Sequence, residues 1–291
     1  MNELRLRANA KINLFLEVLD KRPDGYHNIE TVFQSIDLHD VISLTETPGD
    51  ITVSCDNPQV PLDSSNLAYK AAEMLLEKSG ERCGVKIHIA KNIPVGAGLA
   101  GGSADAAATL VGLNELWELG YSIEELMRMG GRLGADVPFC IMGGTALGRG
   151  KGDELTRLMP FDEIPVVIAN PGFQVSTAWA YGNLRNLGLT RERKSANILI
   201  GRMQKRDILN AGRELFNIFE DIVEEEYPLV HRMKECFIRS GASGALMTGS
   251  GPTVFALTQD DSSAQCIREQ ASHFADFCIV TRTSSVSIAR M

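Results

Sequence analysis

The sequence contains no apolar run long enough to span a bilayer. Nor does it open with a basic segment followed by an apolar one, as a signal peptide would. The first residues, MNELRLRANAKINLFLEVL, instead alternate between polar and apolar side chains, which is typical of a strand. We therefore expect no signal peptide, no membrane span and no membrane partner.

Disulfide and metal-binding patterns are also missing. None of the six cysteines lies in a CxxC pair, and the five histidines show no HxxxH or similar spacing. Most of the cysteines have apolar neighbours, so the pattern predicts reduced thiols in the core of a cytoplasmic protein. We expect no metal site built from the protein's own side chains.

A surplus of positive charge is absent. The chain has 29 Lys and Arg against 37 Asp and Glu, a net charge of −8 and a pI near 5.3. This balance argues against a general nucleic-acid surface. With 291 residues, of which 44% are hydrophobic and 23% charged, the chain is typical of a globular protein with one large domain or two modest ones.

Strand-like and helix-like segments do not alternate strictly along the chain. This order predicts an α+β fold rather than a doubly wound sheet. A proline-bounded stretch at residues 160–165 predicts two domains, of residues 1–160 and 161–291. Strands are expected at residues 4–7, 12–18, 40–46, 50–54, 85–90, 145–155 (as a hairpin), 166–170 and 277–284, with a glycine turn and a strand within 244–258; helices are expected at 66–78 (capped by Ser65), 106–113, 121–134, 176–184, 226–241 and 264–272.

The stretch PVGAGLAGGSADAAATL, residues 94–110, places a glycine-rich loop directly before a helical run. A helix start has unpaired N–H groups and partial positive charge, and glycines let a ligand approach the main chain, so this combination favours a phosphate site. A plain connector is the alternative. The loop does not follow a strand directly, as a Rossmann fingerprint would, and no Lys follows its last glycine, as in Walker A.

Two segments near the start of the chain contain notable polar residues, the first of them among apolar residues typical of a protein core. Lys11 and Asn13 alternate with apolar neighbours, so they point to one face of a strand. We expect Lys11 in an active site, although a solvated lysine is the common case. The segment PDGYH follows. A tight turn needs Asp24 and Gly25 but does not explain Tyr26 and His27, and Tyr26 can equally be an ordinary packing residue.

Two later segments complete the pattern. In LGADVPF, Asp136 is a single acid among apolar residues, and carboxylates are seldom buried without a partner. Asp136 can also cap a helix, because Pro138 suits an early helical position. In TGSGPTVFAL, residues 248–257, a second glycine turn is suited to closing over a ligand, or it is a plain hairpin turn.

Taken together, these segments resemble the GHMP kinases, the family of galactokinase, homoserine kinase and mevalonate kinase. The central motif is PVGAGLAGGSADAAA and the last is GSGPTVFAL. The stretches GYHNIETVFQ and GADVPF are specific for one enzyme within the family, and the resemblance covers essentially the whole chain. It implies a two-domain α+β fold, with an N-terminal ATP-binding domain similar to ribosomal S5 domain 2, a C-terminal GHMP kinase domain, and the site in the cleft between them.

The resemblance also implies an activity and its residues. It implies phosphorylation by ATP, with Mg²⁺, of the 2-hydroxyl of a cytidine diphosphate-linked methylerythritol, in the methylerythritol phosphate route to isoprenoids. Asp136 would take the hydroxyl proton and Lys11 would polarise the hydroxyl. No protein ligand for magnesium is obvious beyond Ser103. The implied site residues are Lys11 and Asp136 for catalysis; Pro94, Val95, Gly96, Ala97, Gly98, Leu99, Ala100, Gly101, Gly102, Ser103 and Ala104 for ATP; and Asn13, Tyr26, His27, Thr177 and Tyr181 for the substrate, with Phe173 open as the second aromatic.

Two other functions remain open from the sequence. One is another small-molecule kinase of the family, such as homoserine or mevalonate kinase. The other is a non-catalytic domain of the same fold, like its ribosomal and RNA-binding relatives. The acidic net charge and the presence of both Lys11 and Asp136 oppose the second.

Overall fold

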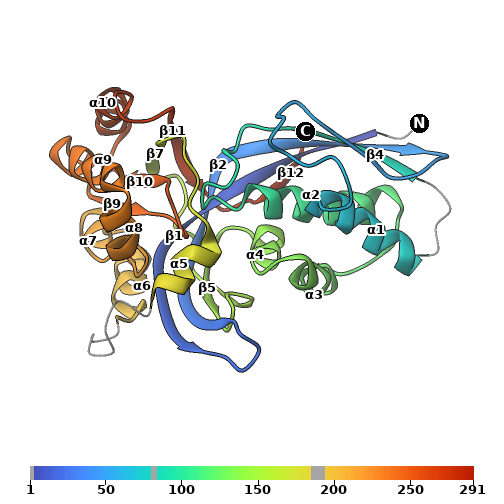
Figure 1. Cartoon of the computed structure of the whole chain (residues 1–291), viewed down its shortest axis with the longest axis horizontal. Helices are drawn as coiled ribbons and strands as arrows, with labels where there is room; N and C mark the ends of the chain where they lie inside the picture. Colours follow the sequence, from blue (N-terminus) through green and yellow to red (C-terminus); the bar gives the residue numbers. More distant parts are fainter. Residues whose placement is uncertain (1–2, 80–83, 185–193) are drawn as a thin grey trace.

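The computed structural model describes residues 3–79, 84–184 and 194–291 (Figure 1). The strands are β1 (Glu3–Lys21), β2 (His27–Thr47), β3 (Thr52–Cys55), β4 (Gly84–Ala90), β5 (Thr145–Arg149), β6 (Glu154–Arg157), β7 (Pro165–Asn170), β8 (Phe216–Asn217), β9 (Gly244–Met247), β10 (Val254–Leu257), β11 (Phe277–Ser284) and β12 (Ile288–Arg290). The helices are α1 (Leu67–Ser79), α2 (Gly101–Leu116), α3 (Ile123–Leu133), α4 (Val137–Met142), α5 (Thr177–Asn183), α6 (Asn197–Gln204), α7 (Ile208–Arg213), α8 (Glu220–Glu226), α9 (Pro228–Arg239) and α10 (Asp261–Ala271).

A long antiparallel hairpin, β1 and β2, runs through the whole molecule. On its outer edge β2 pairs in turn with β5, β11 and β4, while β1 pairs with β8 and β12. Helices α1–α4 lie on one side of this spine and α5–α10 surround β7, β9 and β10 on the other (Figure 1). The hairpin therefore joins the two halves and places its middle residues between them.

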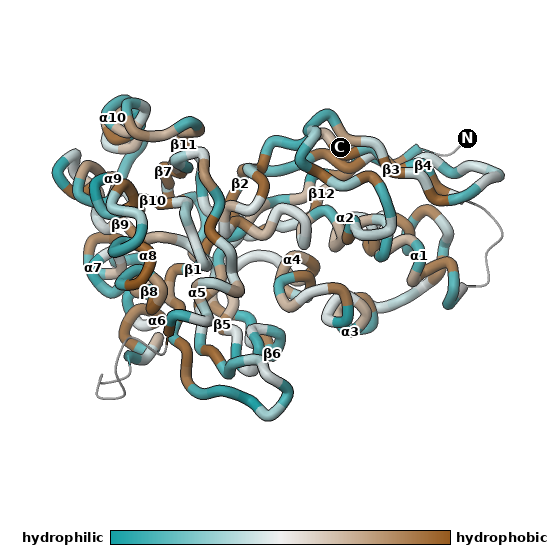
Figure 2. Tube along the Cα trace, in the orientation of Figure 1, coloured by the Kyte–Doolittle hydropathy of each residue, from teal (hydrophilic) through white to brown (hydrophobic). Residues whose placement is uncertain are grey.

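The hairpin differs from the strands expected for it. Residues 4–7 and 12–18 form one strand, because Ala8 and Asn9 continue the pairing with β2 and the pairing resumes at Lys11; Ala8 and Ala10 are fully buried. The register shifts between Asn9 and Lys11, as at a β-bulge, and bulges re-aim side chains near sites. The strand expected at 40–46 is only the end of β2, which begins at His27. The hydrophilic tip of the hairpin projects from the body of the molecule (Figure 2).

Each predicted helix is present, but the starts of several differ from the prediction, most of all that of α2. The start of α1 is capped by Asn66, whose Oδ1 accepts the Ala68 N–H at 2.8 Å; the Ser65 hydroxyl bonds to Asp63 instead, so the predicted cap was wrong. Helix α2 begins at Gly101, before the expected run, because Ala100 takes a left-handed conformation with φ 58°. The start of α2 at Gly101 places the N-terminus of this helix directly at the end of the glycine loop.

Two main apolar cores lie on either side of the hairpin. One is formed by α1, α2 and α3 against β1, β2 and β4, and α2 packs so closely that a Cβ on Gly112 would lie 2.5 Å from Leu44 Cδ1. The other joins β7, β10 and α9 to residues of β1 such as Ile12 and Phe15. Because the hairpin contributes to both cores, the division near residue 160 stays a prediction.

Two further expectations concern the whole chain. No described helix combines the length and the apolar character needed to cross a membrane. Of the cysteines, Cys140 is buried, but Cys266 is exposed on α10, so the expectation of core thiols was wrong there; Cys83 lies outside the described residues.

Candidate active site

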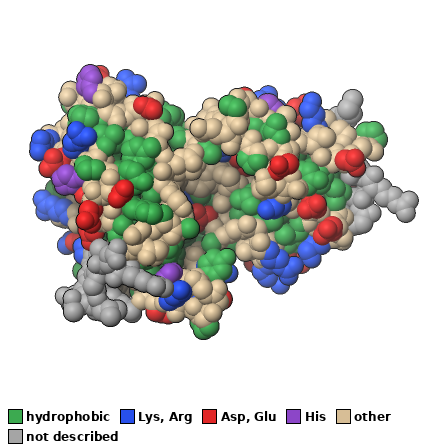
Figure 3. All heavy atoms as spheres, viewed as in Figure 1, with side chains coloured by type: hydrophobic (Ala, Val, Ile, Leu, Met, Phe, Trp, Pro, Cys, Tyr) green, Lys and Arg blue, Asp and Glu red, His purple; other side chains and the backbone are tan. Residues whose placement is uncertain are grey.

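A cleft of about 890 Å³ opens between the two halves of the molecule (Figure 3). It is lined by the middle and tip of the hairpin, the glycine loop, the start of α4 and α5, and the turn after β9. Most of the predicted site residues line it: Lys11, Asn13, Tyr26, His27, Pro94, Val95, Gly96, Ala97, Gly98, Ala100, Gly101, Gly102, Ser103, Asp136, Thr177 and Tyr181. Leu99 and Ala104 do not, because their side chains are buried in the cores.

The glycine loop runs from β4 to the first turn of α2. Gly96, Gly98 and Ala100 all have positive φ, so the main chain turns in ways that side chains disfavour. A Cβ on Gly101 would lie 2.9 Å from Lys91 Nζ, whereas a Cβ on Gly102 would meet only Leu67, at 3.9 Å. Gly102 is thus the residue at which the helix N-terminus is open to the cleft, and this end can hold phosphate groups.

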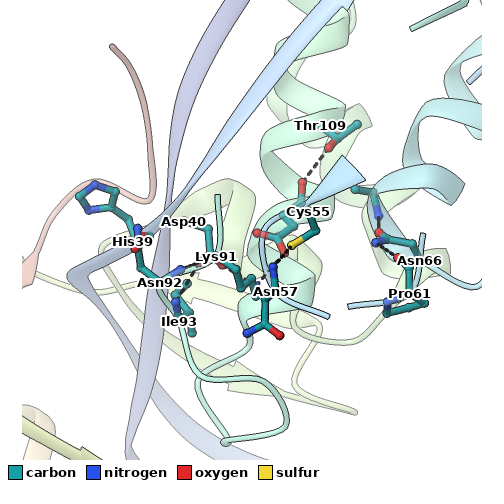
Figure 4. A network of polar contacts seen from close by, with 12 residues as sticks. His39, Asp40, Cys55, Asn57, Pro61, Asn66, Lys91, Asn92, Ile93 and Thr109 are labelled. Carbon is teal, nitrogen blue, oxygen red and sulfur yellow. Dashed lines mark hydrogen bonds and ion pairs between the residues drawn. The ribbon is translucent and has the colours of Figure 1, made fainter. Parts of the chain in front are cut away.

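A buried cluster of charges lies beneath this loop (Figure 4). The Lys91 ammonium, whose side chain is 3% exposed, bonds both to Asp40 on β2 and to Asp105 on α2, the latter at 2.8 Å. The other oxygen of Asp40 accepts the backbone N–H groups of Asn92 and Ile93, at 2.7 and 2.8 Å. The entry to the loop and the start of α2 are thereby fixed to the same strand.

The charges of this cluster do not balance, since two carboxylates share one ammonium group. Burial raises the pKa of Asp105 to about 8, and the nearby Asp40 carboxylate adds to the rise, while Lys91 opposes it. Burial acts to lower the pKa of Lys91, but Asp105 and Asp40 raise it above its ordinary value. Oδ1 of Asp105 is buried without a hydrogen-bond partner among the described residues. The burial of this carboxyl is therefore the least compensated by hydrogen bonds in the cluster.

Lys11 and Asp136 meet in the middle of the cleft. The Lys11 ammonium is 3.5 Å from Asp136 Oδ2, and it also donates to Asn13 Oδ1 at 2.8 Å and to the Gly98 carbonyl at 3.2 Å. The Asp136 side chain is 34% exposed and makes no capping bond to α4, so it is free to face a ligand. The structure therefore brings together Lys11 and Asp136, the two residues that the resemblance implies as the catalytic pair, from distant segments.

The C-terminal glycine turn, residues 247–251, closes against this pair. The Thr248 hydroxyl accepts the Asn13 backbone N–H at 2.9 Å, and a Cβ on Gly98 would lie 2.3 Å from the Thr248 carbonyl oxygen. Ser250 of the turn lines the cleft and bonds to the Thr177 hydroxyl at 2.9 Å. The turn thus contacts the hairpin, the glycine loop and α5 together.

Aromatic side chains line the end of the cleft at the hairpin tip. His27 stacks on Tyr181 with ring centroids 5.1 Å apart, and Lys151 Nζ lies 5.1 Å from the ring of Tyr26, which is 61% exposed. Burial raises the pKa of Tyr181 to about 12, and the charge of Asp136 adds to the shift. Phe173 instead stacks on Tyr227 at 4.8 Å and does not line the cleft, so Tyr181 is the better placed of the two aromatics.

Comparison with known proteins gives the family of this chain. Family models described as the N-terminal and C-terminal domains of GHMP kinases match residues 66–144 and 199–276. A 4-diphosphocytidyl-2-C-methyl-D-erythritol kinase of Acetivibrio thermocellus is 42% identical over 97% of this chain and 100% of its own length. The chain belongs to the GHMP kinases.

Other GHMP kinases are similarly close. The kinase of the same name from a Synechococcus species is 47% identical over 88% of this chain and 86% of its own length. A crystal structure of 4-(cytidine 5'-diphospho)-2C-methyl-D-erythritol kinase superposes with a TM-score of 0.81 and 30% identity, covering 97% of this chain and 99% of the other. The predicted two-domain GHMP fold is confirmed, and the protein is a kinase, for which the family implies ATP as the phosphate donor.

Some parts of this GHMP kinase cleft were missed in the sequence. Lys151 lies in a glycine-rich hairpin, Lys91 directly follows β4, and Asp40 lies within β2. Charged residues in such segments are ordinarily solvated. Beyond the glycine loop, Val60, Pro61 and Leu67 line an apolar end of the cleft. A lone Asp in the alanine run of α2 was the available signal for the buried cluster, because that run is otherwise apolar.

The raised pKa of Asp105 predicts how stability depends on pH. The folded protein binds a proton here that the unfolded chain releases near pH 4, so unfolding free energy falls as pH rises from about 4 to 8. Asp105→Asn removes this titration. We expect its melting temperature to exceed that of the parent protein by a margin that grows from pH 5 to pH 8.5, measured by calorimetry.

The matched control lies on the exposed side of the same helix. Glu115→Gln breaks a surface pair with Arg290 and should leave the pH profile unchanged. Parallel profiles for Asp105→Asn and the parent protein would contradict the assignment of a buried, protonated Asp105.

Proposed function

We propose that this protein transfers the γ-phosphate of ATP to the 2-hydroxyl of 4-diphosphocytidyl-2-C-methyl-D-erythritol. The observation that carries the proposal is the position of Lys11 and Asp136 between two different ends of one cleft, a glycine loop at a helix N-terminus and an aromatic tip. The names of the relatives at 42% and 47% identity support the same substrate. The reaction belongs to the methylerythritol phosphate route to isoprenoid precursors.

The glycine loop suits the donor. The open N-terminus at Gly102 and the hydroxyl of Ser103 would face the phosphates, and the apolar end at Val60, Pro61 and Leu67 would hold the base of ATP. Among the described residues there is no group of His, Cys, Asp and Glu that could cage a metal. Mg²⁺ would be held by phosphate oxygens and water, with Ser103 as the candidate protein ligand, and it would offset the phosphate charge.

The aromatic end suits a flat base. The exposed ring of Tyr26 offers a stacking face, and the stacked pair of His27 and Tyr181 forms the facing wall. Asn13 and Thr177 line the cleft between this end and the reacting centre, where they can bond the polyol.

Phosphoryl transfer needs alignment and charge stabilisation more than covalent chemistry. The substrate oxygen bonds to the γ-phosphorus, its proton passes to Asp136 Oδ2, and the bond from the γ-phosphorus to the bridging oxygen breaks to release ADP. Lys11, fixed by Asn13 and Gly98, orients the hydroxyl and stabilises the negative charge that develops on it. The proposal also places the enzyme in the cytoplasm, where free thiols such as Cys266 persist.

A transfer assay tests the function directly. Labelled ATP is offered with 4-diphosphocytidyl-methylerythritol, with homoserine and with mevalonate, and the products are separated. We expect label in the 2-phosphate of the first acceptor only. Transfer to homoserine or mevalonate instead would replace the proposal with another kinase of the family, and transfer to none of the three would refute it.

Asp136→Asn tests the base. The substitution keeps size and most hydrogen bonding but removes the proton acceptor, so kcat should fall by roughly a hundredfold or more. ATP affinity, measured by titration with a non-hydrolysable analogue, should change little. Near-normal turnover would mean that Asp136 has only a local structural role.

Tyr181→Ala and Phe173→Ala distinguish the two candidate aromatics. Because Tyr181 lines the cleft and Phe173 does not, only Tyr181→Ala should weaken CDP binding, by about 1–3 kcal/mol as for other stacked bases. Tyr181→Phe should be mild, since stacking needs the ring. Calorimetric titration with CDP and with an ATP analogue measures both sites; a loss with Phe173→Ala alone would reverse the assignment.

A further inference from the structure

We propose that Asn217 is a positioning residue for phosphoryl transfer, which it serves by holding the C-terminal glycine turn against Asn13 and Gly98. The inference rests on the proposed function, because it assigns the turn a role at the reacting centre. Asn217 itself does not line the cleft. It is buried on β8, a strand of two residues. This strand belongs neither to the glycine motifs nor to the segments of Lys11 and Asp136.

The carboxamide of Asn217 makes hydrogen bonds to the backbone of three residues. Its Nδ2 donates to the carbonyl oxygens of Met247 and Gly249, at 2.7 and 2.8 Å, and its Oδ1 accepts the Phe219 N–H at 3.0 Å. An amide has two donors and one carbonyl, so few other side chains can make this set of bonds. Both carbonyls belong to the C-terminal glycine turn, and the bonds fix its orientation.

Asn217 is in turn fixed to the strand that carries the catalytic lysine. It pairs with Leu16 of β1, and the next N–H, of Ile218, donates to the Leu16 carbonyl at 2.9 Å. The turn is therefore tied to β1 at two points, through Asn217 at Leu16 and through the Thr248 hydroxyl at Asn13. Asn217 thereby sets the position of the turn relative to β1, and Thr248 passes that position on to Asn13.

The turn has contacts that transmit its position to Lys11. Asn13, which bonds to Thr248, accepts from the Lys11 ammonium at 2.8 Å, and the Gly98 carbonyl accepts from it at 3.2 Å. The Thr248 carbonyl sits where a side chain on Gly98 would be, so a displaced turn displaces Gly98. A shift of the turn by a fraction of an ångström would therefore move Lys11 relative to Asp136, and small misplacements at a reacting centre are costly to rate.

Asn217→Asp is the test variant. It keeps the shape and the oxygen that accepts from Phe219, but it puts a second oxygen against the carbonyls of Met247 and Gly249. We expect kcat for 4-diphosphocytidyl-methylerythritol to fall by about tenfold or more, with the KM values for both substrates within about threefold. If Asn217→Asp does not fold, Asn217→Ser removes the same two bonds without adding charge, and the same result is expected.

Asn114→Asp is the matched control. Asn114, near the far end of α2, also makes two bonds through its carboxamide, to the backbone of Tyr121, and it lies away from the cleft. It should lower the melting temperature and leave kcat unchanged. An equal loss of kcat in the two variants, or a rise in KM without loss of kcat, would overturn the proposal.

A double variant and a spectroscopic readout complete the test. Thr248→Val breaks the next contact in the same chain, so Asn217→Asp with Thr248→Val should lose little more kcat than the more damaging single variant; a multiplicative loss would refute a shared path. In two-dimensional amide NMR, signals of Asn13 and Gly98 should shift in Asn217→Asp but not in Asn114→Asp. That readout needs no turnover, so unshifted signals refute the Asn217 role while a parent protein without transfer activity refutes only the proposed function.

Discussion

A buried ammonium group that must not remain unpaired determines the arrangement of the site. Lys11 is almost entirely removed from water, and an uncompensated charge in that position would cost several kcal/mol. Its partners come from the same strand, from the glycine loop and from the start of α4. Satisfying this one cation thus brings three separate segments together, and the geometry that neutralises it is also the geometry in which a hydroxyl can be oriented.

A second buried lysine acts on the other side of the glycine loop. Lys91 lies directly beneath Gly101, whereas Lys11 holds the carbonyl of Gly98. Glycines permit close approach of a phosphate but carry a high conformational entropy in the free chain. Holding both ends of the loop with buried charges offsets that entropy and leaves the main chain at Gly102 open to the cleft.

Much of this could be predicted from local sequence. The α+β class, the helix at 121–134 with its Ser122 and Glu125 capping box, and the helix after the glycine loop all follow from propensity, caps and periodicity. The cleft residues Lys11 and Asp136 were detectable because each is a charged residue among apolar neighbours in the sequence. Pairing between distant strands could not be predicted in this way.

The residues that could not be identified from the sequence were missed for the same reason, because their partners lie far away along the chain. Asp40 and Lys91 look ordinary alone, and Asp105 stands out in its alanine run without indicating a partner. Only the packing of β2, the end of β4 and α2 reveals the three as one cluster. Asn217 likewise has no signal in sequence, since its partners are backbone carbonyls thirty or more residues away. The predicted Ser65 cap failed for a local reason, because Asn66 accepts the N–H group of Ala68 at the start of α1.

The pairing of β1 also constrains how the protein is made. Leu6, Arg7 and Ala8 pair with Arg290, Ala289 and Ile288, so contacts of the first strand wait for residues separated from it by nearly the whole chain. During synthesis on a ribosome, β1 and β2 emerge early, yet one edge of β1 stays uncovered until β8 and then β12 arrive. An open edge is a template for wrong pairing. During this interval the twist and the register shifts of the hairpin oppose pairing of that edge with other chains.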